Sequence, residues 1–173
     1  MEIIVVSDTN IFIDLYKVGL LDEFFSLTIH VHTTDLIIHE LKVKEQRSKI
    51  LGYEKLFIKK FNMQEMMELV NFQRKMHDMT NVSIQDCSVW AYAQDNDYTL
   101  LTGDSKLRKI AIKEGTNVRG ILYIFDKMVE EKLLTPQKAC EKIQLLRQSN
   151  ARLPTKEIEK RVCLWSSKED TFT

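Results

Sequence analysis

The stretch that decides the fold lies at residues 3–15 and reads IIVVSDTNIFIDL. Its first part, Ile3–Val6, is a continuous run of β-branched apolar residues, which is typical of a parallel strand buried on both faces. The run leads directly to Asp8, and a helical pattern follows it. In open α/β sheets the functional crevice lies at the carboxyl ends of the strands. The stretch therefore predicts an aspartate that the first strand delivers to this edge of a sheet.

A second stretch, YTLLTGDS at residues 98–105, has the same arrangement. Tyr98–Leu101 reads as a short buried strand, and a tight turn then leads to Asp104. Because parallel strands end at the same edge, we expect Asp104 and Asp8 to face each other. Two carboxylates at close range repel unless a proton or a cation compensates them. The pair therefore predicts a divalent-metal site.

Short apolar strands alternate with helices along the rest of the chain, which predicts an α/β fold. We expect a three-layer α/β/α sandwich with a mainly parallel central sheet. The predicted strands are Ile3–Val6, Thr28–His32, Leu56–Phe61, Tyr98–Leu101 and a short strand that begins at Val118. The predicted helices cover residues 11–16, 20–25, 35–41, 64–76, 83–95, 106–113, 121–131, 136–146 and 155–164. The charged segment 42–52 fits either a helix end or a loop.

Length and composition limit the classes of protein that fit. The chain has 173 residues, enough for one domain with its own core. Its 25 basic and 25 acidic residues balance, so net charge gives no argument for nucleic acid. Three scattered cysteines match neither a zinc motif nor a disulfide framework, which predicts a reducing compartment. The apolar run near the amino terminus is too short for a signal peptide or a membrane span, so we expect a cytoplasmic protein.

Two further acids are candidates because of their surroundings. Glu40 lies in the apolar string LIIHEL, and Asp86 lies in SIQDCSVWAYA near the start of a predicted helix. Each acid also has a structural interpretation. Asp8 and Asp104 could cap the helices that follow them, Ser83 and Asp86 fit a capping box, and Glu40 could be solvated. Burying four such acids without partners would be costly, so together they favour a site.

The strings SDTNIFIDL, IIHEL, SIQDCSVWAYA and LLTGDSKL, taken in order, resemble the PIN-domain nucleases. The family's acidic positions fall at Asp8, Glu40, Asp86 and Asp104. The resemblance covers residues 1–150, which we expect to form the nuclease domain, and leaves residues 151–173 as a C-terminal helical tail. The segment NVRGILYIFDKMVEEKL and the later ARLP also resemble one prokaryotic PIN subgroup.

The resemblance implies a metal-dependent ribonuclease that hydrolyses phosphodiester bonds in RNA. The acids at positions 8, 40, 86 and 104 would be both metal ligands and catalytic residues. A site built only from oxygen ligands suits Mg²⁺ or Mn²⁺. Asn10, Thr102 and Ser105 could orient the carboxylates, or could be ordinary turn and capping residues. The subgroup resemblance further implies the toxin of a type II toxin–antitoxin pair, with an antitoxin protein as partner and a homodimer as assembly.

Basic residues near the acids are candidates for binding the RNA backbone. Lys44 and Arg47 lie in a charged segment soon after Glu40, and Lys106 follows Asp104 closely. Such residues could contact phosphates. The segment around Lys44 also contains acids, which favours a solvated helix face of mixed charge over a phosphate contact.

Two other functions compete with a nuclease. The first is a PIN-like RNA-binding or scaffold module with a weak metal site, against which the four retained acids argue. The second is a phosphotransferase of the haloacid dehalogenase type, which also begins with a strand and an aspartate. That chemistry usually needs a second aspartate two residues later, where this chain has Asn10.

Overall fold

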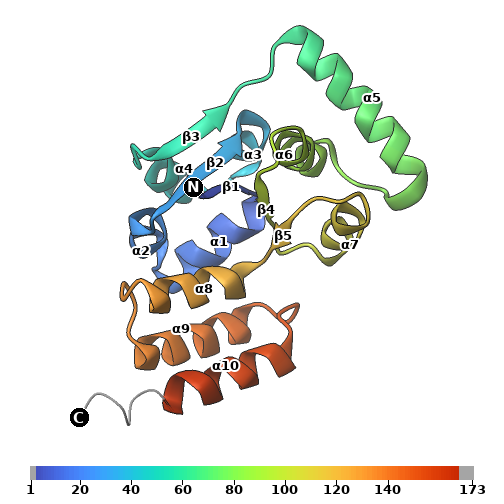
Figure 1. Ribbon diagram of the computed structural model, residues 1–173. Coiled ribbons are helices and arrows are strands. Elements are labelled where there is room, and N and C mark those ends of the chain that lie inside the picture. The colour runs from blue at the N-terminus through green and yellow to red at the C-terminus, as the bar shows by residue number, and fades with distance from the viewer. Residues whose placement is uncertain (1–2, 168–173) are drawn as a thin grey trace. The chain divides into compact units, whose positions relative to one another are not determined.

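The computed structural model describes residues 3–167, without the side chains of residues 77–80. Five parallel strands form one sheet in the order β3-β2-β1-β4-β5 (Figure 1). The strands are β1 (Ile3–Ser7), β2 (Ile29–Thr34), β3 (Leu56–Lys59), β4 (Thr99–Leu101) and β5 (Val118–Arg119). The central strand β1 buries Val5 and Val6 completely, as its β-branched run predicts. The prediction of a mainly parallel sheet is confirmed, and every strand pair is parallel.

Ten helices accompany the sheet within the described residues. They are α1 (Thr9–Val18), α2 (Leu21–Ser26), α3 (Asp35–Glu40), α4 (Lys44–Leu51), α5 (Met63–Thr80), α6 (Ile84–Asp95), α7 (Ser105–Lys113), α8 (Ile121–Glu130), α9 (Pro136–Ser149) and α10 (Thr155–Ser167). The segment that the sequence left open forms α4, an exposed helix of which only Ile50 is fully buried. Strand β3 is shorter than predicted, because the chain leaves the sheet after Lys59.

The direction of the crossovers gives the sheet its two helical layers. The β2–β3 connection moves outward on one side of β1, and the β4–β5 connection moves outward on the other side. Connections between parallel strands are almost always right-handed, so α4 and α7 cover opposite faces of the sheet. Helix α6 contacts β1, β2 and β4. The predicted three-layer α/β/α architecture is confirmed.

The chain contacts divide the protein into two compact units. The first unit contains the whole sheet and consists of residues 3–13 and 28–121. The second unit consists of residues 14–27 and 122–167, and is helical. Helices α9 and α10 pack on each other there, so residues 151–167 of the predicted tail pack in this unit. The end of that tail, residues 168–173, lies outside the described residues.

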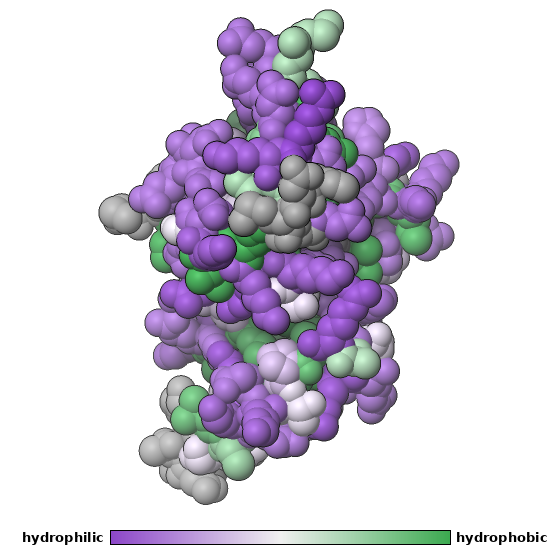
Figure 2. All heavy atoms as spheres, turned by 90° about the vertical axis from the view of Figure 1, so that its right-hand side faces the viewer, coloured by the Kyte–Doolittle hydropathy of each residue, from purple (hydrophilic) through white to green (hydrophobic). Residues whose placement is uncertain are grey.

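The face of the molecule in Figure 2 shows no large apolar patch among the residues that are coloured there. Hydrophilic residues predominate there, and the hydrophobic ones form small separate groups. No helix in the described part of the chain combines the length and the apolar character that crossing a membrane requires.

Candidate active site

Asp8 is the residue around which the acidic edge of the sheet is built. It follows the last residue of β1 and is 1% exposed. Its Oδ1 accepts a hydrogen bond from the Ile11 N–H at 3.0 Å. Its Oδ2 accepts one from the Thr102 hydroxyl at 2.5 Å and one from the Gly103 N–H at 3.3 Å. The loop after β4 therefore holds the carboxylate that follows β1, as the parallel pairing of these strands predicts.

Burial makes the charged form of Asp8 costly. It raises the pKa of the Asp8 carboxyl from 3.8 to about 7, against the lowering effect of the Thr102 and Ile11 hydrogen bonds. The charge of Asp86 raises this pKa further. A nearby cation would reverse both unfavourable effects, because it stabilises the ionised carboxylate.

Asp104 lies on the same edge and begins helix α7. Its Oδ1 caps the helix by accepting hydrogen bonds from the Lys106 N–H at 2.7 Å and the Leu107 N–H at 2.8 Å. Its own N–H donates to the Thr102 Oγ1 at 3.0 Å, so this one hydroxyl links Asp104 to Asp8. The capping interpretation is confirmed for this residue. Its Oδ2 has no hydrogen bond within the described part of the chain and stays available to a ligand.

Glu40 ends helix α3 and reaches the start of α1. Its Oε2 accepts a short hydrogen bond from the Thr9 hydroxyl. Because Thr9 follows Asp8 directly, this contact brings the glutamate next to the strand-end aspartate. Thr9 was not among the predicted site residues. Its only signal was a hydroxyl beside the first acid.

Asp86 lies in the first turn of α6 and forms the predicted capping box with Ser83. The Asp86 N–H donates to the Ser83 Oγ at 3.0 Å, and the Ser83 hydroxyl donates back to the Asp86 Oδ2 at 2.8 Å. Burial raises the pKa of Asp86, and the charges of Asp104 and Glu40 raise it further. Since Asp86 also raises the pKa of Asp8, it interacts electrostatically with all three other acids.

The four acids are close enough to interact electrostatically, but they do not form a complete metal-binding site as they stand. No three acid, histidine or cysteine side chains among the described residues lie close enough together to hold an ion as they stand. Each acid is instead hydrogen-bonded to nearby protein groups. The donor set still fits Mg²⁺ or Mn²⁺, because it consists of oxygens alone. Glu40, Asp86 and Asp104 each also keep one oxygen without a described hydrogen bond.

The predicted supporting residues differ in how directly they touch the acids. Thr102 contacts two of them, as described above. Asn10 lies beside Gly103. The Asn10 Cβ is 3.4 Å from the position that a Cβ would occupy if residue 103 had one. Ser105 begins α7, and no described hydrogen bond joins its hydroxyl to an acid.

The basic residues fall into two groups. Lys106 is exposed on the first turn of α7, next to Asp104. Arg108 is on the same helix, and its Nη1 lies 3.1 Å from the position that a Cβ would occupy at Gly120. The Thr102 carbonyl also lies next to Gly120, so Arg108 reaches the loop that holds Asp8. Lys44 and Arg47 are exposed on α4, and neither contacts any of the four acids in the part of the protein that the structure describes.

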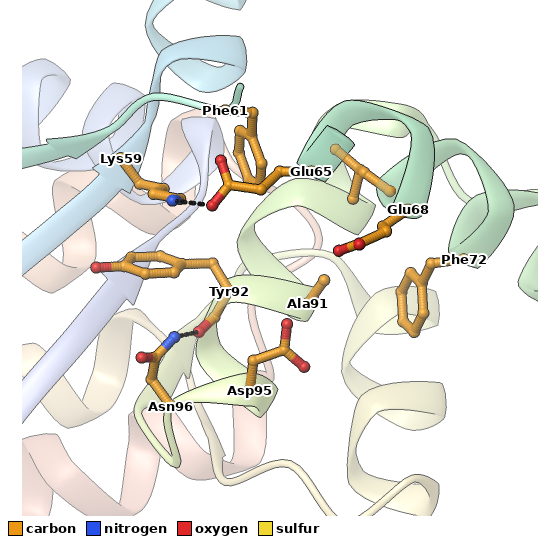
Figure 3. A pocket seen from close by; sticks show the side chains of 10 residues that line it. Lys59, Phe61, Glu65, Glu68, Phe72, Ala91, Tyr92, Asp95 and Asn96 are labelled. Atoms are coloured by element: carbon orange, nitrogen blue, oxygen red, sulfur yellow. Dashed lines mark hydrogen bonds and ion pairs between the residues drawn. The ribbon is translucent and has the colours of Figure 1, made fainter. Parts of the chain in front are cut away.

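A separate cavity of about 460 Å³ lies at the end of β3, between α5 and α6 (Figure 3). Its walls include Phe61, Phe72 and Tyr92, and Lys59 crosses one side to pair with Glu65 at 2.6 Å. None of the four candidate acids lines this cavity. The cavity and the four acids are therefore separate features of this unit.

Comparisons with known proteins give the family. A family model described as a PIN domain matches residues 4–167. No curated protein matches the chain. Among solved structures, PAE2754 from Pyrobaculum aerophilum is similar with a TM-score of 0.53 and 12% identity, over 75% of this chain and 99% of that one. VapBC2 from Rickettsia felis, bound to a DNA fragment from its promoter, has a TM-score of 0.48 and 15% identity, over 68% and 98% of the two chains.

A PilT N-terminus domain protein, SSO1118 from Sulfolobus solfataricus P2, is also similar, with a TM-score of 0.46 and 12% identity over 74% of this chain and 95% of that one. At such low identity, the likeness to PAE2754 speaks for the fold alone. The family match covers nearly the whole chain and includes all four acids on the sheet edge. The chain therefore belongs to the PIN-domain family.

Proposed function

We propose that this PIN-domain protein is a metal-dependent ribonuclease that hydrolyses phosphodiester bonds in RNA. The observation that carries the proposal is the electrostatic link from Asp86 to Asp8, Glu40 and Asp104 at the carboxyl edge of the sheet. Acids that raise each other's pKa in one crevice are typical of functional sites. Helix capping accounts for individual contacts of Asp104 and Asp86, but it does not require the four acids to lie near one another.

The proposed ligands are the carboxylates of Asp8, Glu40, Asp86 and Asp104, with Mg²⁺ or Mn²⁺ as the ion. When bound, the ion would activate a water and neutralise charge on the phosphate during an in-line displacement. Asp8 would anchor the ion, because three hydrogen bonds fix its carboxylate. The other three acids would turn their free oxygens inward. Thr102 would hold Asp8 and Asp104 in fixed positions relative to each other.

RNA is the proposed substrate, and its backbone would approach over α7. Lys106 is the nearest of the predicted phosphate contacts to the acids, and Arg108 adds a second cation on the same helix. Lys44 and Arg47 would form a second, separate contact with the RNA on α4. The subgroup resemblance supports a role as the toxin of a type II toxin–antitoxin pair. An antitoxin protein and a second copy of this chain are then the proposed partners.

One observation favours the alternative of a catalytically weak RNA-binding or scaffold module. As they stand, the acids hydrogen-bond to nearby protein groups, and no three of them are placed to hold an ion. If the cost of releasing these hydrogen bonds exceeds the gain from metal binding, the protein would bind RNA without cleaving it. The two functions differ in one measurable property, the affinity for Mn²⁺.

A cleavage assay with a metal titration tests the proposal. Purified protein should cleave single-stranded RNA in Mg²⁺ or Mn²⁺ and stop in the presence of a chelator. Isothermal titration should show Mn²⁺ binding that Asp8→Asn removes. RNA binding without Mn²⁺ binding or cleavage would establish the scaffold function instead. Cleavage by Asp8→Asn at the wild-type rate would place the activity elsewhere or in a contaminant.

A further inference from the structure

Two buried hydroxyls join the helices that carry Glu40 and Asp86. Thr34 ends β2 and caps α3, and Ser88 lies in the second turn of α6. Both residues are 0% exposed, and the Thr34 Oγ1 and Ser88 Oγ are 2.8 Å apart. Glu40 is on the first of these helices and Asp86 on the second. This contact is therefore a direct polar link between the elements that carry two of the four acids.

The protons of this link have one consistent arrangement. The Ser88 hydroxyl donates its single proton to the Gln85 carbonyl at 2.6 Å. The Ser88 Oγ must then accept from Thr34, whose own oxygen accepts from the Ile37 N–H at 3.3 Å. The result is a relay of three hydrogen bonds from the first turn of α3 to the first turn of α6. We call it the Thr34–Ser88 relay.

The relay works against a force that pushes the two helices apart. Glu40 and Asp86 lie on the two helices that the relay joins, and their ionised carboxylates carry like charges. Without a cation, this repulsion favours a wider separation of α3 and α6. A buried hydrogen bond resists such opening, because a broken one leaves polar groups without partners and without water.

We propose that the Thr34–Ser88 relay is a positioning device that keeps Glu40 and Asp86 close enough to share one cation. The inference rests on the proposed function, since it needs these acids to be ligands. Neither hydroxyl would touch the ion, because both are fully buried. The relay acts through the helix starts: Thr34 fixes the origin of α3, and Ser88 fixes the turn in which Asp86 lies between Gln85 and Cys87.

Four variants of the whole chain separate positioning from general stability. Ser88→Ala removes the acceptor of the relay and leaves the Thr34 cap of α3 in place. Thr34→Val breaks the relay and the cap together, whereas Thr34→Ser keeps both. Thr116→Val is the matched control. It removes a buried hydroxyl that accepts a hydrogen bond at 3.0 Å from the Nε1 of Trp90, a residue that lies farther along α6 than Ser88.

The measurement is the Mn²⁺ dissociation constant by isothermal titration, with thermal unfolding of each variant measured in parallel. Ser88→Ala and Thr34→Val should weaken Mn²⁺ binding roughly tenfold, the low end of the effect of residues that orient metal ligands. Thr34→Ser should bind as wild type does. Thr116→Val should lose stability and keep its Mn²⁺ affinity. If Ser88→Ala does not fold, Ser88→Cys replaces it, since the sulfur of a thiol is only a weak acceptor for the Thr34 hydroxyl.

The outcomes distinguish this inference from the function on which it rests. If Ser88→Ala binds Mn²⁺ as tightly as the wild type does, while Asp8→Asn does not bind it, the positioning role of the relay would be wrong and the metal site would be supported. An equal loss of affinity in Thr116→Val would also overturn it, because the effect would then follow stability. A wild-type protein that binds no Mn²⁺ would overturn both.

Discussion

Two buried aspartates in the same short stretch, Asp8 and Asp14, have opposite surroundings. Burial raises the pKa of both carboxyls. Around Asp14, Asn150 donates an amide hydrogen bond at 2.8 Å, and the charges of Lys17 and Arg152 lower the pKa. Around Asp8, the charge of another acid, Asp86, raises the pKa of the carboxyl. Asp14 thus has compensating partners in its own protein unit, whereas the described surroundings of Asp8 contribute a second negative charge.

This difference predicts that the same substitution has unlike effects at the two positions. Asp8→Asn should abolish RNA cleavage, because it removes the charge that would hold the ion. Asp14→Asn should leave the cleavage rate unchanged, because its partners lie in the helical unit with α9. Single-turnover cleavage of a labelled RNA measures both. Equal losses in the two variants would remove the functional distinction between these aspartates.

The second prediction concerns stability without metal. The folded protein holds a proton on Asp8 more tightly than the unfolded chain does. The free energy of unfolding should therefore fall as pH rises from about 4 to about 7, and level off above that. A pKa change from 3.8 to about 7 corresponds to about 4 kcal/mol. Urea denaturation in chelator across this range measures the slope.

Asp8→Asn is the control for that slope. It should flatten the pH dependence and be more stable than the wild type at pH 8 in chelator. The gain should be smaller than the full amount, because one asparagine nitrogen must face either the Ile11 or the Gly103 N–H. Added Mn²⁺ should stabilise the wild type and not this variant. A wild type whose stability rises with pH over the same range would contradict the assignment.

The third prediction tests the Asp14 side of the comparison. Asn150→Ala removes the amide that donates to Asp14 and leaves the buried carboxylate with less compensation. It should lower the free energy of unfolding by about 1–3 kcal/mol, the cost of a buried polar group that loses its partner. Mn²⁺ affinity, measured by titration, should not change. A change in that affinity would show that the two aspartates are coupled.

The smallest expected effect concerns the basic residues. Lys106→Ala and Lys44→Ala should each weaken RNA binding severalfold and reduce the slope of log affinity against log salt by about 1. Neither should alter Mn²⁺ binding. Fluorescence anisotropy with Asp8→Asn as background avoids cleavage during the measurement. If Lys44→Ala leaves the slope of log affinity against log salt unchanged, α4 does not contact the RNA backbone and is an ordinary solvated helix.

The sequence predicted the parts of this molecule that local patterns control. Buried runs placed Asp8 and Asp104 after strands that end at the same edge of the sheet, and the capping-box pattern placed Ser83 at a helix start. The state of residues 44–51 stayed open, because an exposed charged helix has almost no apolar periodicity.

Contacts between distant residues were beyond the reach of such patterns. Thr9 meets Glu40 from 31 positions away, Thr34 meets Ser88 from 54 positions away, and Asp14 meets Asn150 from 136 positions away. Single hydroxyls and amides carry no periodic signal, so only the folded arrangement reveals what they contact. Local patterns predicted the Asp104 cap and the Ser83–Asp86 pair, but not the contact between Glu40 and Thr9.

The backbone of Asp8 continues the β1–β4 pairing beyond the strand itself, since its N–H donates to the Leu101 carbonyl at 3.0 Å. Its amide hydrogen should therefore exchange with solvent only when these two strands separate. The backbone of this aspartate cannot shift without opening the middle of the sheet. In the proposed metal site, adjustment between a small ion such as Mg²⁺ and a large one such as Ca²⁺ would fall to the acids on α3 and α6, so those helices would determine which ion is selected.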